Sequence, residues 1–234
     1  MTHSSSGTSL HFALWLGCIA TVGLSPIMAE AKEWTSVSTE KGIEVELLEK
    51  GNGELPAFRG TGIIEAPLLE VAVVILDAAR LPEWAHKCAE SRLIQDDGDQ
   101  KGRVIYNRTS APWPVADRDV VVRSRMELDR EKKQVSFVFH GVTHPKAPSV
   151  DGVVRMVKMK GHYRLRVVSE SRTEVQYMID ADPGGSLPKW IVKLASESLP
   201  LETVKGLRKQ VRKMRNNPKY VALRKTLLEK YGTL

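Results

Sequence analysis

The chain has 234 residues, a formal net charge of +7, 42% hydrophobic residues and only 6% aromatic residues. This length suits one ordinary domain with a sizeable core, or at most two small ones. Seventeen glycines and twelve prolines are ordinary for the length, and two cysteines are too few to staple a chain of this size. Collagen-like, low-complexity and disulfide-scaffold architectures are therefore excluded.

Residues 1–31 have the pattern of a signal peptide. An apolar run from Phe12 to Leu24, too short to span a bilayer, precedes the small-x-small pattern Ala29-x-Ala31 that signal peptidase reads. No Lys or Arg precedes the run, so a short membrane anchor stays open as the alternative. We predict cleavage after Ala31 and export to the periplasm, which leaves Cys88 as the one cysteine of the mature chain.

The mature chain begins with a pattern typical of two strands and a helix. Short apolar stretches at 44–48 and 58–64 flank the turn Gly51-Asn52-Gly53. Pro67 suits a first helical turn, and apolar residues then recur at helical spacing as far as Arg80. We expect this helix to end at Leu81-Pro82.

After Trp84 the period of the pattern changes from that of a helix to that of strands. Turn-forming residues separate the successive segments. The candidate strands are 91–96, 102–109, 119–128, 135–142, 153–159, 162–168 and 174–181.

A helical pattern returns at Leu187 and holds to about Met214, and a second short helix is expected over 219–230. Strands in a run flanked by helices, without βαβ alternation, predict an α+β fold with one curved antiparallel sheet. We assign one domain to residues 32–215 and a basic helical extension to 216–234.

Alternation gives several strands one uncharged face and one charged face. In 119–128 the even-numbered residues are uncharged and the odd-numbered ones, apart from Val121, are charged; 135–142 and 162–168 behave similarly. Such faces either pack solidly against the terminal helix or enclose an apolar hollow with it. Alternation alone does not distinguish the two.

The long terminal helix changes character at Pro200. Before it, one apolar stripe faces a single direction, and after it the stripe moves by about half a turn. Because proline removes a backbone hydrogen bond and crowds the preceding turn, a kink or break is expected near Leu199-Pro200. Two helices with different neighbours and a lid that hinges there both fit the pattern. The first stripe comprises Leu187, Ile191, Leu194, Ala195 and Ser198.

The excess positive charge lies at the C-terminus, where residues 189–234 hold twelve Lys or Arg and three Asp or Glu. A basic amphipathic element suits an anionic membrane surface, although an ordinary solvated face has the same pattern. The bases are not interleaved with aromatic residues, which argues against nucleic-acid binding.

No segment has the spacing of a nucleophile elbow, a phosphate loop or a zincin helix. His140 and His144 lack further metal ligands nearby. Cys88 near His86 fits a structural cysteine better than a reactive one. We expect no catalytic residue, no metal site and no cofactor.

Three segments taken in order resemble the START (steroidogenic-acute-regulatory-related lipid-transfer) domain family, including its phosphatidylcholine-transfer branch. They are Pro-Trp-Pro-Val-Ala-Asp-Arg-Asp-Val-Val at 112–121, Gly-Val-Val-Arg-Met at 152–156 and Asp-Ala-Asp-Pro-Gly-Gly-Ser-Leu-Pro-Lys-Trp-Ile at 180–191. The resemblance covers roughly 33–215, and the last segment is its most specific element. The chain is identified as an exported bacterial member.

The resemblance implies a helix-grip fold, in which a curved antiparallel sheet wraps a long C-terminal helix around a hydrophobic cavity. It implies a monomer that binds one lipid or sterol and carries it between membranes without catalysis, in peripheral contact with an anionic membrane surface. The alternative is a cyclase- or aromatase-like enzyme on the same fold. A third interpretation is an accessory protein whose closed core binds nothing.

Under this resemblance the uncharged strand faces become the cavity lining, and Pro112, Trp113 and Pro200 belong to the gate. An unpaired buried charge is costly, so a lining of Val, Ser and Met favours a ligand whose buried end is weakly polar. Arg155 and Tyr163 are the candidate polar anchors, whereas Arg118-Asp119 is expected to hold the start of its strand. The expected ligand-binding residues are Val120, Val122, Ser124, Met126, Phe137, Phe139, Arg155, Tyr163, Leu165, Ile191, Leu194 and Ser198.

Overall fold

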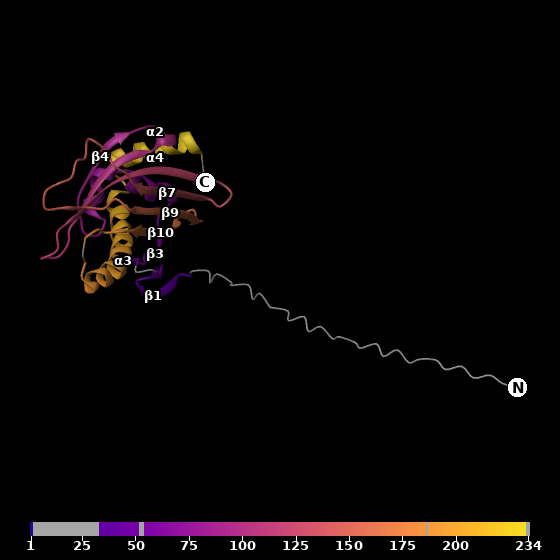
Figure 1. The fold of residues 1–234 in the computed structure, drawn as a ribbon. Coiled ribbons are helices and arrows are strands. Elements are labelled where there is room, and N and C mark those ends of the chain that lie inside the picture. Colours follow the sequence, from indigo (N-terminus) through magenta and orange to yellow (C-terminus); the bar gives the residue numbers. More distant parts are fainter. Residues whose placement is uncertain (2–32, 52–53, 186, 233–234) are drawn as a thin grey trace. The chain divides into compact units, whose positions relative to one another are not determined.

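The computed structural model describes Met1 and residues 33–51, 54–185 and 187–232. The predicted signal peptide lies outside these residues, and all helices and strands belong to the unit Lys32–Leu234 (Figure 1). The strands are β1 (Thr35–Glu40), β2 (Ile43–Leu48), β3 (Ala57–Ile64), β4 (Cys88–Asp96), β5 (Arg103–Thr109), β6 (Arg118–Asp129), β7 (Gln134–Gly141), β8 (Val154–Arg155), β9 (Met159–Ser169) and β10 (Arg172–Ala181). The helices are α1 (Leu68–Leu76), the 3-10 helix η1 (Ala78–Glu83), α2 (Gly98–Lys101), α3 (Lys189–Met214) and α4 (Pro218–Tyr231).

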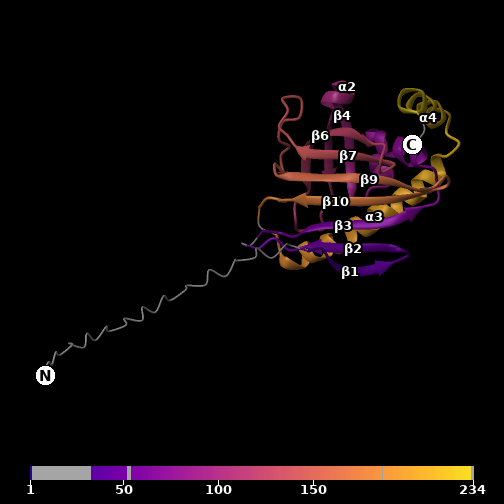
Figure 2. The same cartoon turned by 90° about the vertical axis from the view of Figure 1, so that its right-hand side faces the viewer.

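The strands form one sheet in the order β1-β2-β3-β10-β9-β7-β6-β5-β4. Neighbours along this path are antiparallel, and the short β8 pairs in parallel with the start of β6. Figure 2 shows these strands stacked one beside the next, with α3 crossing them at a slant. The expected α+β fold, a curved antiparallel sheet with a long C-terminal helix, is confirmed.

Several elements differ from the sequence-based expectation. The helix expected to end at Leu81-Pro82 ends at Leu76, because Asp77 leaves the helical conformation, and the 3-10 helix η1 then runs through Pro82. The short helix α2 lies where a turn was expected.

The strand expected over 153–159 is reduced to β8, because the amides of Val154 and Met156 donate to the carbonyls of Asp117 and Asp119 beside β6 and the chain then leaves the sheet. Strand β1 at the sheet edge was not expected. Helix α3 continues through Pro200 without a break, so the interpretation as two separate helices is wrong.

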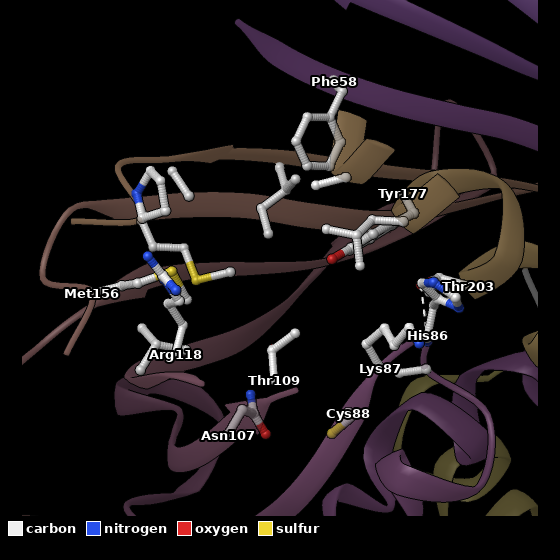
Figure 3. Close-up of a pocket in the computed structure, with 18 of the residues that line it drawn as sticks. Phe58, His86, Lys87, Cys88, Asn107, Thr109, Arg118, Met156, Tyr177 and Thr203 are labelled. Carbon is white, nitrogen blue, oxygen red and sulfur yellow. Dashed lines mark hydrogen bonds between the residues drawn. The ribbon is translucent and has the colours of Figure 1, made fainter. Parts of the chain in front are cut away.

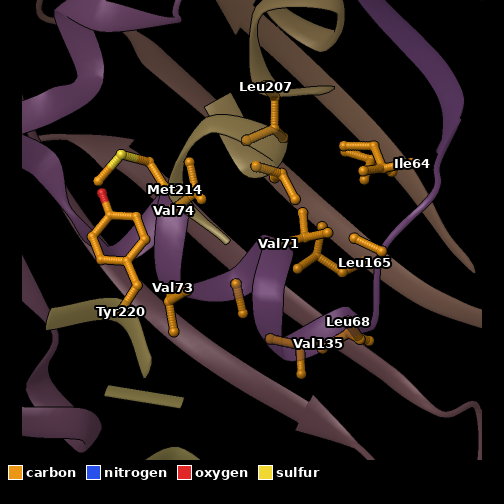
Figure 4. Packing of buried hydrophobic residues seen from close by; sticks show 14 of the residues in the cluster. Ile64, Leu68, Val71, Val73, Val74, Val135, Leu165, Leu207, Met214 and Tyr220 are labelled. Carbon is orange, nitrogen blue, oxygen red and sulfur yellow. The ribbon is translucent and has the colours of Figure 1, made fainter. Parts of the chain in front are cut away.

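One end of the inner sheet face is filled by a solid hydrophobic core (Figure 4). Helix α1 contributes most of its residues to this core, and the second half of α3 contributes Leu207, Val211 and Met214. Tyr220 and Leu227 of α4 belong to the same cluster, so the segment expected as an extension packs onto the domain.

Two acidic side chains fasten the helices of this end to one another. Glu70 of α1 accepts hydrogen bonds from Arg215, at 2.9 Å, and from Arg224, at 2.6 Å. Asp77 accepts from the Lys219 ammonium at 2.9 Å and from the Tyr220 hydroxyl at 3.1 Å. These contacts hold α4 on α1 and leave the first half of α3 to cover the other end of the sheet.

Candidate functional site

A cavity of about 540 Å³ lies beside the solid core, between the inner face of the sheet and the first half of α3 (Figure 3). Its volume is within the range of about 300–1,000 Å³ that is typical of small-molecule sites. Most of the lining side chains are apolar and come from β5, β6, β7, β9, β10 and α3. The inner face is therefore hollow at one end and packed at the other, which combines the two outcomes that alternation left open.

Strand β6 shows the division between cavity and core most clearly. Val120, Val122 and Ser124 line the cavity, as their alternation predicted. Met126 and Leu165 lie at the packed end of the sheet, where Leu165 is fully buried in the core and Met126 packs against it. Their expected place in the lining is wrong, because α1 and the second half of α3 fill the space over this end of the sheet.

Aromatic side chains form one wall of the cavity. Tyr163 and Tyr177, paired across β9 and β10, stack with their ring centroids 4.6 Å apart, and Phe139 lies 6.1 Å from Tyr163. Phe139 has room for its ring because its neighbour across β7 and β9 is Gly161, where a Cβ would lie 2.6 Å from the ring. Burial raises the pKa of both tyrosine hydroxyls, which keeps them protonated.

The other expected lining and gate residues divide clearly. The expected ligand-binding residues Phe137, Ile191, Leu194 and Ser198 lie in the cavity lining. Of the three expected gate residues, Pro112 lies in the lining, and Trp113 and Pro200 do not. Trp113 is 91% exposed on the loop between β5 and β6. Pro200 is buried against β3, where a Cβ added at Gly60 would lie 2.9 Å from the proline Cβ.

Arg155, one of the two expected polar anchors, does not line the cavity. Its guanidinium forms a two-pronged ion pair with Asp119, at 2.7 and 2.9 Å, and also donates to the carbonyls of Ala147 and Pro148. Asp119 is only 1% exposed, so this pair is a buried structural link between β6 and β8. The expectation that Asp119 holds the start of its strand agrees with this geometry.

Arg118 lines the cavity, which corrects the expectation that it only holds the start of the strand. It shares the inner face with Val120 and Val122 because the three are two residues apart on β6. Extending the alternation by one step would have found it. The sequence analysis stopped at Asp119, since Asp117-Arg118-Asp119 resembles a local ion-pair cluster.

Several further polar residues of the lining were missed. Asn107 and Thr109 come from β5, opposite Val120 and Arg118. His86 comes from the segment after η1, and Cys88 is the first residue of β4. Burial raises the pKa of the Cys88 thiol to about 11 and lowers the pKa of His86. At neutral pH both groups are therefore uncharged.

The cavity is bordered by two segments that carry exposed apolar side chains. The loop at 110–117 contributes Pro112 and Val115 to the lining and is closed at its base by Asp117, which accepts a hydrogen bond from the Ala111 amide at 3.1 Å. The beginning of α3 leaves Trp190 and Leu194 more than half exposed.

Within the described ranges, no three His, Cys, Asp or Glu side chains are grouped so that they could hold a metal ion. None of the helices in the described part of the chain is long and apolar enough to cross a membrane. The site is thus an internal, largely apolar cavity with a few polar side chains.

An antiparallel sheet that grips a long C-terminal helix over an apolar cavity defines a helix-grip ligand-binding domain. The START domain sequence profile matches residues 16–219, and the chain belongs to the START domain family, whose members bind and transfer lipids. The chain is 30% identical to an uncharacterized protein of Pseudomonas aeruginosa, over 79% of this chain and 90% of that protein.

Two further relatives have informative descriptions. The phosphatidylcholine transfer protein of Bos taurus is 30% identical over 70% of this chain and 78% of its own length. The crystal structure of a STAR-related lipid transfer protein fragment from Xanthomonas axonopodis matches with a TM-score of 0.68 and 29% identity, over 76% of this chain and 98% of that one.

Proposed function

We propose that the protein binds one lipid in the cavity under α3 and carries it between membranes. The apolar cavity of about 540 Å³ is the observation that carries this proposal, and membership in a family of lipid-transfer domains supports it. Burial of about 400 Å² of ligand surface would contribute about 10 kcal/mol before the costs of ordering, at about 25 cal/mol per Å². That drive is large enough to hold a lipid in solution.

The loop at 110–117 and the first half of α3 act as the gate in this proposal. Both segments line the cavity, the first through Pro112 and Val115 and the second through Ile191 and Leu194. The second half of α3 is anchored in the core and by Arg208, which donates to the carbonyls of Ile63, Lys41 and Gly42. A ligand can therefore enter by movement of the first half while the rest of the fold stays packed.

Membrane contact is proposed at the border of the cavity, through Trp113, Trp190 and Leu194. Tryptophan suits the boundary between lipid and water because it is apolar with one polar group. The basic helices are less available than their charge suggests, because many of their cations are engaged within the domain. Lys205, Arg208, Lys213, Arg215, Lys219 and Arg224 each hydrogen-bond to the protein.

The proposal further holds that the protein is an exported, periplasmic monomer without catalytic activity. None of the described lining residues is Asp or Glu, and the lining tyrosines and Cys88 are protonated at neutral pH. Protonated tyrosines and a protonated thiol are poor bases, which leaves His86 as the one described lining group able to act as a base at neutral pH. Polyketide turnover by the wild type that is lost in Tyr163→Phe would overturn the proposal that the protein is not catalytic. Cell fractionation tests the periplasmic location, and size-exclusion chromatography tests the monomeric state.

Transfer of a fluorescent phospholipid from donor to acceptor vesicles tests the function and its gate together. Cysteines at Val115 and Leu194, in a Cys18→Ser/Cys88→Ala background, would be joined by a bifunctional maleimide. We expect transfer by the uncrosslinked protein and its loss on crosslinking, with recovery when a reducible crosslinker is cleaved. Transfer that continues unchanged after crosslinking would contradict the gate, and no transfer by any form would contradict the function.

A further inference from the structure

Arg118 is a buried guanidinium that forms no direct ion pair with any acid in the described part of the chain. It is 8% exposed, its Nη1 donates to the Ala116 carbonyl, and among the described residues its Nε has no hydrogen-bond partner. The negative charge of the neighbouring Asp117 acts on it from a distance and partly offsets the lowering of its pKa by burial. The Asp117 carboxylate itself forms an ion pair with Arg108, at 3.1 Å, and accepts a hydrogen bond from the Ala111 amide. An arginine keeps its charge in such a site, so the missing partner is costly.

Other arginines around this strand are paired. Arg123 forms an ion pair with Asp97 at 2.7 Å, Arg125 with Glu127 at 2.8 Å, and Arg155 with Asp119 at 2.7 Å. Arg118 differs because its side chain lies in the cavity lining, where no described residue is an acid (Figure 3). A ligand is therefore the available source of a negative partner.

Asn107 provides a second unsatisfied group close to Arg118. It lines the cavity from β5, and its Oδ1 is buried without a partner in the described part of the chain. In the register of β5 and β6, Asn107 pairs with Val120 and Thr109 pairs with Arg118. Asn107 and Arg118 are thus diagonal neighbours on one face, within reach of one polar head group.

We propose that Arg118 binds the anionic oxygen of an acidic lipid, a carboxylate or a phosphate, while the acyl chains fill the apolar part of the cavity. Asn107 contacts the same head group. This inference rests on the proposed function and names the chemical class of its ligand. It replaces the expectation of a weakly polar buried end, which rested on the Val, Ser and Met positions of β6 and did not count Arg118 among the lining residues.

The test compares acidic lipids with neutral lipids of the same chains on the delipidated full-length protein. Oleate is paired with oleyl alcohol, dioleoyl phosphatidate with dioleoylglycerol, and inorganic phosphate alone serves as the head-group control. We expect each acidic lipid to bind about tenfold to 100-fold more tightly than its neutral partner, as for a charge-assisted hydrogen bond. Comparison of oleate with dioleoyl phosphatidate shows whether Arg118 binds a carboxylate or a phosphate. Binding of inorganic phosphate, without a preference for either acidic lipid over its neutral partner, would overturn the proposal that the bound anion belongs to a lipid.

Arg118→Met is expected to remove this preference without lowering the unfolding midpoint, because it deletes an unpaired buried charge. The matched control is Arg125→Met, on the opposite face of β6, which should keep the preference. Equal binding of acidic and neutral lipids by the wild type would overturn this inference and leave the proposed lipid-carrier function standing. That comparison needs no variant. Failure of every lipid to bind overturns both the inference and the proposed function.

Discussion

Gly60 in β3 lies directly beneath Pro200 in α3, so closely that a Cβ at Gly60 would approach the Pro200 Cβ to 2.9 Å and its carbonyl oxygen to 3.1 Å. This contact lies close to where α3 changes role, since the helix lines the cavity as far as Thr203 and contributes to the core from Leu207 onward. The absence of a side chain at Gly60 therefore sets how closely the helix approaches the sheet.

Gly60→Ala should push α3 away from the sheet at Pro200. We expect the free energy of unfolding to fall by about 1–3 kcal/mol, as for other overpacked sites. Urea denaturation monitored by circular dichroism measures it. Glu197→Ala, at an exposed position of the same helix, is the control and should stay within about 0.5 kcal/mol of wild type. An unchanged stability of Gly60→Ala would show that the helix is not held at this distance.

Arg155→Met should be strongly destabilising, in contrast to Arg118→Met. It leaves Asp119 buried and without its ionic partner, which typically costs about 3–5 kcal/mol. Thermal unfolding measures the loss, and Arg164→Met, an arginine on β9 whose hydrogen bond to Gln176 is exposed, is the comparison. A ligand-anchoring role for Arg155 would instead leave the stability of the empty protein almost unchanged.

The strand residues show where reasoning from the sequence placed side chains correctly and where it failed. Strand alternation placed Val120, Val122, Ser124 and Phe139 correctly, because a period of two follows from strand geometry alone. Alternation could not show that Met126 and Leu165 face helices, since that depends on where α1 and α3 end.

The fold itself was predictable from the alternation of strands, the helical period after Leu187 and the resemblance carried by residues 112–121, 152–156 and 180–191. The partners of the charged side chains were not predictable from the sequence. Arg155 meets Asp119 only because β8 runs in parallel beside β6, a long-range pairing that no local pattern reveals.

Trp113→Ala should weaken vesicle binding without changing stability. The side chain is almost fully exposed, so its loss removes little packing in the free protein but a large apolar group from the proposed membrane contact. We expect about tenfold or greater loss of binding in a liposome flotation assay. Leu93→Ala, an exposed apolar residue on β4, is the control. Equal loss in both variants would contradict a localised contact.

Cys88 should react slowly with maleimide. Because burial raises its pKa to about 11, roughly one thiol in a thousand is ionised at pH 8, so we expect alkylation about 100-fold slower than at a free cysteine. The rate should rise with pH toward 11, and bound lipid should slow it further because Cys88 lines the cavity. Peptide mapping separates this reaction from that of Cys18. Alkylation as fast as that of a free thiol, with or without lipid, would contradict an enclosed cavity.

Native mass spectrometry of the protein purified from its own host tests the central claim most directly. A START domain whose cavity carries a lipid should show a bound mass of one lipid per chain, released on denaturation and identified by lipidomics. A mass equal to the bare polypeptide, with no uptake of any added lipid, would contradict the claim that the cavity under α3 is a carrier site.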